Sequence, residues 1–213
     1  MKLKLIIFDF YKTLGFQVSK IELKDFFVFY KKIGVEFKTE EDIKAFTLLF
    51  SELIGCSANW LELGKNLLEK VLEKPSPEKI KALADFYKEN IVYQLYDDVK
   101  EIINLPYRKA VLTANAKFLI KKLGLEKFAK LFTPRETKFL KPDPKAFLAV
   151  LENLKVKPEE TIMVGDEIER DLIPAQNLGM KTILIDRGNK IEDSPFKKIS
   201  SLAELKNLLE PVV

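Results

Sequence analysis

The amino-acid sequence predicts an α/β fold, in which a parallel β-sheet carries helices on both faces and a helical segment is inserted near the beginning of the chain. Two observations support this prediction. Apolar runs typical of buried parallel strands lie at residues 5–8, 161–164 and 181–185, and helical patterns separate the later runs. Between about residues 19 and 89 the pattern is helical throughout, without a convincing strand.

The first predicted strand, at residues 5–8, ends at a carboxylate, Asp9. Its four consecutive apolar residues indicate a strand that is buried on both faces. In open α/β sheets ligands bind beyond the carboxyl ends of the strands, where Asp9 and the neighbouring Thr13 would lie. Aspartate also commonly caps turns, so Asp9 by itself does not define a site.

The inserted segment contains four predicted helices. Capping residues mark their beginnings at Ser19, Thr39, Ser57 and Ser76, and breaks fall at Gly34, Gly55 and Lys74-Pro75. Aromatic residues gather on the faces of these helices, at Phe26, Phe27, Phe29, Tyr30, Phe46 and Phe50. We interpret them as helix packing rather than as a ligand pocket.

The chain after residue 96 alternates between predicted helices and strands. Helices are predicted at residues 97–103, 116–123 and from a capping box at Ser201, and strands at 109–112, 161–164 and 181–185. Together with the first strand they form a Rossmann-like parallel sheet core. We therefore predict a core made of residues 1–15 and 94–213, and a helical insertion made of residues 16–93.

The composition limits the chemistry that is available. The 213-residue chain contains no histidine, which excludes Ser-His and Cys-His catalysis and histidine-ligated metals. Its single cysteine, Cys56, forbids an internal disulfide and fits a reducing, cytoplasmic location. Catalysis is therefore left to carboxylates, lysine or hydroxyl groups.

Charge and hydropathy argue against two kinds of partner. The 36 Lys and Arg residues and the 32 Asp and Glu residues occur in mixed order, without the basic stripe that binds nucleic acid. No apolar stretch reaches the length of a membrane span, and the run near the N-terminus is too short for a signal peptide. The abundance of lysine and glutamate favours a thermostable protein. We expect a monomer or a homodimer.

Several chemically active side chains lie at predicted strand ends or in loops of the sheet. In chain order they are Asp9 and Thr13, Thr113 and Asn115, Lys141, and Asp166 with Asp171. The hydroxyl and amide of Thr113 and Asn115 suit a phosphate oxygen, and two prolines stiffen the loop around Lys141. Each has an ordinary explanation alone, as a cap, a turn residue or a solvated lysine. Their joint occurrence in this order predicts one functional site.

These segments resemble the four motifs of the haloacid dehalogenase superfamily of hydrolases, and the resemblance covers the whole chain. The matching segments are Asp9-Phe10-Tyr11-Lys12-Thr13, Thr113, Lys141, and Gly165-Asp166 with Asp171. The helical insertion is similar to the first-type cap that covers the active site in that superfamily. The resemblance implies a hydrolase that works through an aspartyl-enzyme intermediate.

The resemblance also assigns roles to single residues. Asp9 would be the nucleophile, and Thr113 and Lys141 would hold the transferring group, with Thr13 and Asn115 as further substrate-binding candidates. Asp9, Asp166 and the main-chain carbonyl of Tyr11 would bind Mg²⁺, which prefers hard oxygen ligands. Asp171 would orient Lys141 in a supporting role.

One departure from the phosphatase pattern concerns Tyr11. Phosphatases of the superfamily carry a second aspartate here, which protonates the leaving group and then activates water. Tyrosine, with a pKa near 10, donates a hydrogen bond but is a poor base at neutral pH. Loss of a general acid/base costs about 10² to 10⁴ in rate, so we expect a slow phosphatase unless another carboxylate, such as Glu167, takes over.

Tyr11 also supports an alternative, an (S)-2-haloacid dehalogenase that forms an aspartyl ester at Asp9. Those dehalogenases carry an Asp-x-Tyr-Gly-Thr-Leu motif, from which this chain differs by Lys12. Other positions disagree: Asp166 would repel a substrate carboxylate, Phe147 stands where the dehalogenases have tyrosine, and residues 16–93 contain no arginine. Asp166 therefore favours a Mg²⁺-dependent phosphatase of a small phosphorylated metabolite over action on a halogenated acid.

A third hypothesis is a module that binds a phosphorylated ligand with little turnover, because Tyr11 replaces the acid/base. The nucleophile, the phosphate-binding residues and the metal ligand are all present, which argues against a complete loss of catalysis.

Overall fold

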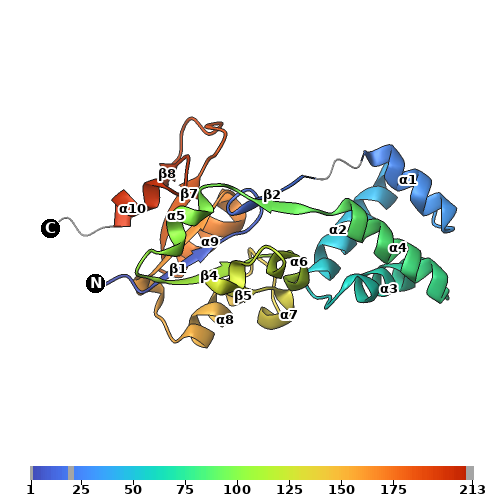
Figure 1. Cartoon of the computed structure of the whole chain (residues 1–213), viewed down its shortest axis with the longest axis horizontal. Coiled ribbons are helices and arrows are strands. Elements are labelled where there is room, and N and C mark those ends of the chain that lie inside the picture. Colours follow the sequence, from blue (N-terminus) through green and yellow to red (C-terminus); the bar gives the residue numbers. More distant parts are fainter. Residues whose placement is uncertain (1, 19–21, 210–213) are drawn as a thin grey trace.

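The computed structural model describes residues 2–18 and 22–209, and its centre is a six-stranded parallel sheet (Figure 1). The strands, in spatial order, are β5 (Lys130–Phe132), β4 (Arg108–Leu112), β1 (Leu5–Phe8), β6 (Thr161–Gly165), β7 (Lys181–Ile185) and β8 (Lys197–Ile199). The predicted α/β fold with a Rossmann-like parallel sheet is confirmed.

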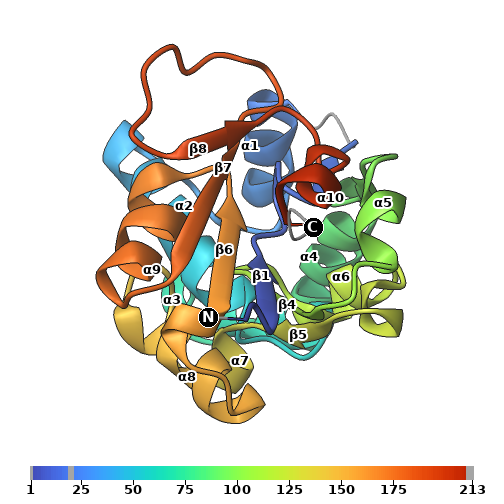
Figure 2. The ribbon, with the colours of Figure 1, turned by 90° about the vertical axis from the view of Figure 1, so that its left-hand side faces the viewer.

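Helices cover both faces of this sheet, as Figure 2 shows. On one side lie α5 (Val99–Ile103), α6 (Lys117–Lys121) and α10 (Glu204–Leu209), and on the other α8 (Pro144–Leu154) and α9 (Ile173–Asn177), with α7 (Pro134–Thr137) next to β5. Alternate residues of β1 enter the two cores: Ile6 and Phe8 face one, and Leu5 and Ile7 face the other. All four are fully buried, which explains the unbroken apolar run.

The inserted segment forms four helices with their own hydrophobic core. They are α1 (Leu23–Lys32), α2 (Glu40–Ile54), α3 (Trp60–Val71) and α4 (Pro77–Asn90). Thr39 and Ser76 cap α2 and α4 as predicted. The assignment of Ser57 as the cap of α3 was wrong: Asn59 caps that helix, and the Ser57 hydroxyl instead donates to the carbonyl of Leu53. The predicted start at Ser19 lies outside the described residues.

A short antiparallel ribbon of β2 (Gly15–Gln17) and β3 (Tyr93–Leu95) joins the helical segment to the sheet (Figure 1). Neither strand was predicted from the sequence, and β5 and β8 were not predicted either. Each of the four has only three residues, too few to show an alternating pattern. The expected boundaries between core and insertion, after residue 15 and before residue 94, fall inside this ribbon.

The helical segment also contacts the core at the turn between α2 and α3. There the backbone amide of Arg135 donates to the carbonyl of Gly55 at 3.3 Å, and its guanidinium donates to the carbonyl of Cys56 at 3.0 Å. Gly55 has no room for a side chain, because a Cβ would overlap the carbonyl of Ala114 and the ring of Pro134. The ribbon and this turn therefore hold the helices near the sheet, together with α6, whose Phe118 ring lies 5.0 Å from that of Trp60. None of the helices in the described part of the chain is long and apolar enough to cross a membrane.

We expect Gly55→Ala to destabilise the protein by about 1–3 kcal/mol, because the added methyl group overlaps the backbone of Ala114 and forces the turn away from the core. Thermal unfolding measures the loss. Gly188→Ala is the matched control, since a Cβ there meets only the flexible side chain of Lys190. Equal melting temperatures for the two variants would contradict this account of the contact.

Candidate active site

Three neighbouring strands bring the predicted site residues to one edge of the sheet. β1 lies between β4 and β6, and Phe8 is opposite both Val111 and Val164. Asp9 therefore emerges beside Thr113 on one side and beside Gly165-Asp166 on the other. The carboxyl ends of parallel strands meet at this edge, which is where ligands bind in α/β folds.

Lys141 lies at the centre of this edge, in contact with two carboxylates. Its ammonium nitrogen is 2.5 Å from Oδ1 of Asp9 and 2.5 Å from Oδ1 of Asp171. Only 5% of its side chain is exposed, so both ion pairs are shielded from water. Burial opposes the charge on Lys141, but the two aspartates raise its pKa above the usual value. Lys141 is therefore protonated, and positively charged, in the site.

Asp171 reaches Lys141 from a π-helical turn at Ile168–Leu172 that directly follows the β6 segment. Its carboxylate packs against Gly165, where a Cβ would overlap it. Its other oxygen, Oδ2, accepts from the backbone amide of Glu167 at 3.4 Å. The Glu167 side chain points to a different partner, the exposed Arg170. Glycine at position 165 is thus required by the close approach of Asp171.

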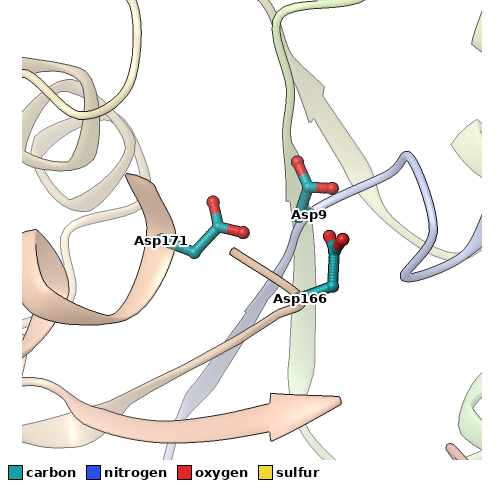
Figure 3. A group of neighbouring side chains, drawn as sticks. All are labelled: Asp9, Asp166 and Asp171. Atoms are coloured by element: carbon teal, nitrogen blue, oxygen red, sulfur yellow. The ribbon is translucent and has the colours of Figure 1, made fainter. Parts of the chain in front are cut away.

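Asp9, Asp166 and Asp171 form a cluster of carboxylates (Figure 3). One oxygen from each lies within 4.8 Å of the others, and among the described residues Lys141 is the one cation in ion-pair contact with the cluster. Burial raises the pKa of Asp9 well above its usual value, an effect that Lys141 opposes and that Asp171 and Asp166 reinforce. Burial, Asp171 and Glu167 raise the pKa of Asp166 to about 6. The site therefore has more negative charge than Lys141 neutralises.

This cluster fits a divalent cation by the chemistry of its donors. Carboxylate oxygens are the hard ligands that Mg²⁺ prefers. A cation would offset the burial and the mutual repulsion that raise the pKa values of Asp9 and Asp166. Asp9 and Asp166 face the cluster from the ends of two neighbouring strands. Both oxygens of Asp171 already have partners, Oδ1 in the ammonium group of Lys141 and Oδ2 in the backbone amide of Glu167, so it is less suited to a ligand role.

Thr13 connects the first motif to the rest of the site. It is fully buried, and its hydroxyl donates to Oδ1 of Asp166 at 3.4 Å. Its carbonyl accepts two hydrogen bonds from the guanidinium of Arg187, at 3.2 and 2.7 Å. Arg187 also contacts Asp98 through two bonds and lies 3.8 Å from the ring centre of Tyr96. This network was not predicted from the sequence, although Arg187 is one of only four arginines and follows a predicted strand.

Thr113 and Asn115 interact with each other rather than with a helix terminus. The Thr113 hydroxyl accepts from the backbone amide of Asn115 at 3.1 Å. The side-chain oxygen Oδ1 of Asn115 accepts from the hydroxyl of Tyr93 at 2.9 Å. The helix begins later, at Lys117, with Ala116 as its cap. The two residues therefore lie in the loop after β4, and Tyr93 ties this loop to the ribbon.

Tyr11 and Lys12 form the tip of a tight turn after β1. Tyr11 is 39% exposed and its ring lies edge-on to Tyr93, with 6.2 Å between the ring centres. Lys12 has a positive φ of 60°, a conformation that glycine adopts at no steric cost. Its ammonium group lies 5.5 Å from the Tyr11 ring centre and acts to lower the pKa of Asp166. A cation thus lies near the site where the resembling motif has glycine.

Comparison with known proteins identifies relatives among phosphatases. A family model of haloacid dehalogenase-like hydrolases matches residues 3–179. A glyceraldehyde 3-phosphate phosphatase of Pyrococcus furiosus is 44% identical over 73 residues, 33% of this chain and 30% of that protein. A phosphoserine phosphatase of Thermus thermophilus is 29% identical over 143 residues, 61% of this chain and 57% of that protein. Each match therefore spans less than two thirds of the relative's length.

Solved structures resemble the chain over nearly its full length. A HAD phosphatase from Thermococcus onnurineus has a TM-score of 0.63 at 23% identity, covering 97% of this chain and 98% of that one. A 2-haloacid dehalogenase from Pseudomonas syringae pv. tomato has a TM-score of 0.68 at 24% identity, with the same coverage. At these identities the likeness shows the fold, and the fold alone does not choose between the two chemistries.

We expect Asp98→Asn to lower the free energy of unfolding at pH 7 by about 1–3 kcal/mol, because Asp98 accepts charge-assisted hydrogen bonds from Arg187 and bonds from Ser201 and Leu202. Burial alone would raise the pKa of Asp98, but these bonds outweigh it and lower the pKa below the usual 3.8. The stabilisation is therefore complete above pH 3.8 and is lost as the pH falls through the lower, folded-state value.

Chemical denaturation of wild type and variant across this pH range measures the effect, and the exposed neighbour Asp97→Asn serves as the control. A stability difference that stays constant below pH 3.8 would argue against the proposed role of the Asp98 charge.

Proposed function

The chain belongs to the haloacid dehalogenase-like hydrolases, and from this premise we propose that it is a Mg²⁺-dependent phosphatase that acts on a small phosphorylated molecule through an aspartyl-phosphate intermediate at Asp9. The observation that supports the proposal most directly is the contact of Lys141 with both Asp9 and Asp171, beside Asp166. That set brings the proposed nucleophile, a cation and the proposed metal ligand into one cluster, in which Asp9 and Lys141 are buried and Asp166 is half-buried.

In the proposed mechanism, Asp9 attacks phosphorus in line. Lys141 contacts Oδ1, so we assign the attack to Oδ2. The phosphorus–oxygen bond to the alcohol breaks, and the alcohol leaves with a proton from water or from Tyr11. A water molecule then attacks the phosphorus of the aspartyl phosphate and loses a proton to solvent, or to Tyr11 where Tyr11 donated one in the first step. The bond between phosphorus and Asp9 breaks, which returns the Asp9 carboxylate and releases inorganic phosphate. Lys141 and the Thr113 hydroxyl stabilise the charge on the transferring group in both steps.

The metal would be held by Asp9, Asp166 and the main-chain carbonyl of Tyr11. When bound, Mg²⁺ supplies positive charge that neutralises the phosphate oxygens and aligns the group for displacement. Asp171 holds Lys141 in position, and Thr13 holds Asp166 through its hydroxyl. Asn115 is a further substrate-binding residue of this proposal. Thr13 was expected to bind the substrate as well, but it is fully buried and donates its one hydroxyl proton to Asp166, so its proposed part is to position that aspartate. The helices α1–α4 serve as a cap, and the expected monomer or homodimer, the thermostability and the cytoplasmic location belong to the same proposal.

Tyr11 sets the expected speed of the reaction. It is exposed and offers a hydroxyl in place of the aspartate that protonates the leaving group in related phosphatases. Its ring contacts Tyr93 and the ammonium group of Lys12, and neither is a carboxylate that could take the place of the missing aspartate. Glu167 is held at Arg170, so it would have to leave that partner to act as a base. We therefore propose a slow enzyme whose best substrates have good leaving groups.

The second candidate is a 2-haloacid dehalogenase, which Tyr11 favours. In that reaction Asp9 would displace halide from carbon, and water would hydrolyse the resulting ester. Asp166 argues against it, because its carboxylate lies in a cluster with those of Asp9 and Asp171 and would repel a substrate carboxylate. A binding module with little turnover is the third candidate, and the same experiment separates all three.

A paired turnover assay tests the proposal. We expect the wild-type protein to release phosphate from an activated aryl phosphate only with Mg²⁺, and Asp9→Asn to lose at least about 10³-fold in rate because the nucleophile is absent. The exposed Glu169→Gln is the matched acidic control. Tyr11→Asp should raise the rate by about tenfold or more, because it restores an acid/base at that position.

Halide release from 2-chloropropionate, measured in parallel, identifies the alternative. Metal-independent halide release that needs Asp9 would contradict the phosphatase proposal, and Mg²⁺-dependent binding of phosphate without any turnover would point to the binding module.

A further inference from the structure

The helical segment contains an aromatic cavity of about 260 Å³ on the side of the β2–β3 ribbon. Its lining includes Phe26, Tyr30, Phe46, Phe50, Tyr87 and Tyr93. The sequence analysis interpreted most of these residues as helix packing, and they do pack: Tyr30, for example, contacts Phe26 and Phe46 with ring centres 6.0 and 5.0 Å apart. The same rings also surround a space, which packing alone does not explain.

The polar groups around the cavity are largely engaged by the protein itself. The hydroxyls of Tyr30 and Tyr87 bond to each other, the hydroxyl of Tyr93 donates to Asn115, and that of Thr47 donates to the carbonyl of Ile43. Among the described residues, none of the side chains that line the cavity is charged. A charged group would lose its hydration there without gaining a counter-ion, whereas a flat apolar group would gain contacts with the ring faces.

Tyr93 links this cavity to the candidate active site. Its side chain lines the cavity, and its ring lies edge-on to Phe10 and Tyr11, with ring centres 5.3 and 6.2 Å apart. Those two residues directly follow Asp9 in the chain. The opposite residue on the ribbon, Gln17, lines the cavity as well. The Tyr93 side chain therefore contacts both the cavity and the first motif.

We propose that this cavity receives the uncharged aromatic part of the substrate, which makes the substrate class the phosphate monoesters of aromatic or similarly flat apolar alcohols. The inference rests on the phosphatase function proposed above and narrows it. The volume of the cavity, about 260 Å³, is large enough for an aromatic group, since an apolar cavity of about 150 Å³ holds a benzene ring. A zwitterionic group such as that of phosphoserine would find no counter-charge among the described lining residues.

A comparison of matched aryl phosphates tests this inference. Phenyl and 2-naphthyl phosphate carry uncharged rings, 3-carboxyphenyl phosphate carries a charged ring, and acetyl phosphate carries no ring. We expect kcat/KM for the uncharged aryl esters to exceed that for the carboxylated ester by about tenfold or more, because only the latter must desolvate a carboxylate.

Thr47 lies on α2 at the exposed edge of the cavity, and Thr47→Trp is designed to cover it. We expect this variant to reduce the ratio of kcat/KM for 2-naphthyl phosphate to that for acetyl phosphate by about tenfold or more. Leu48→Trp adds the same side chain at the neighbouring exposed position, which does not line the cavity, and should leave this ratio unchanged. Calorimetry with 2-naphthol adds a readout that needs no turnover: the wild type should bind it, and Thr47→Trp should not.

The outcomes separate the two proposals. Asp9-dependent hydrolysis of acetyl phosphate, without a preference for uncharged rings and without 2-naphthol binding, would overturn the cavity assignment and leave the phosphatase intact. Binding of 2-naphthol that Thr47→Trp abolishes, in a protein that hydrolyses no phosphate ester, would support the cavity and overturn the phosphatase.

Discussion

The ammonium group of Lys141 is the contact on which the site depends. It lies 2.5 Å from one oxygen of Asp9 and 2.5 Å from one oxygen of Asp171, and all three side chains are nearly withdrawn from water. Breaking such a buried pair by removing one partner typically costs about 3–5 kcal/mol, because the remaining charge is left uncompensated. The charge of Lys141 thus lets the carboxylates of Asp9 and Asp171 lie close together in a buried site. Because Lys141 contacts Oδ1 of Asp9, it also fixes the orientation of the other oxygen, Oδ2.

The sheet and a second ion pair, between Arg187 and Asp98, position Asp166 and the turn after β1, which Lys141 does not contact. Asp166 enters the cluster because β6 ends beside β1, and Thr13 contacts it from the turn after β1. Arg187 holds that turn through the carbonyl of Thr13 and is itself held by Asp98. Lys12 adds a cation at the tip of the same turn, in a backbone conformation that costs a side-chain-bearing residue of order 1 kcal/mol. The first motif is therefore rigid at its base and carries an unusual charge at its tip.

The sequence predicted the parts of this molecule that short patterns encode. The strands at residues 5–8 and 181–185 have the predicted bounds, because each is an apolar run that ends at an aspartate. Lys141 contacts Asp171, the contact that an orienting residue needs, and the orienting role itself stays a prediction. The ion pair between Arg187 and Asp98 could not be predicted, because the two residues are 89 positions apart in the sequence and only the fold brings them together. The aromatic cavity in the helical segment could not be predicted, because the spacing of aromatic residues along a helix is the same around a cavity as in a packed core.

The most direct test of the central claim is to trap the intermediate at Asp9. Borohydride reduces an aspartyl phosphate to homoserine, so the protein is incubated with Mg²⁺ and acetyl phosphate, reduced, digested and examined by mass spectrometry. The account predicts homoserine at position 9 in the wild type and none in Asp9→Asn. Reduction at another carboxylate, or turnover of phosphate esters with Asp9 unmodified throughout, would contradict it.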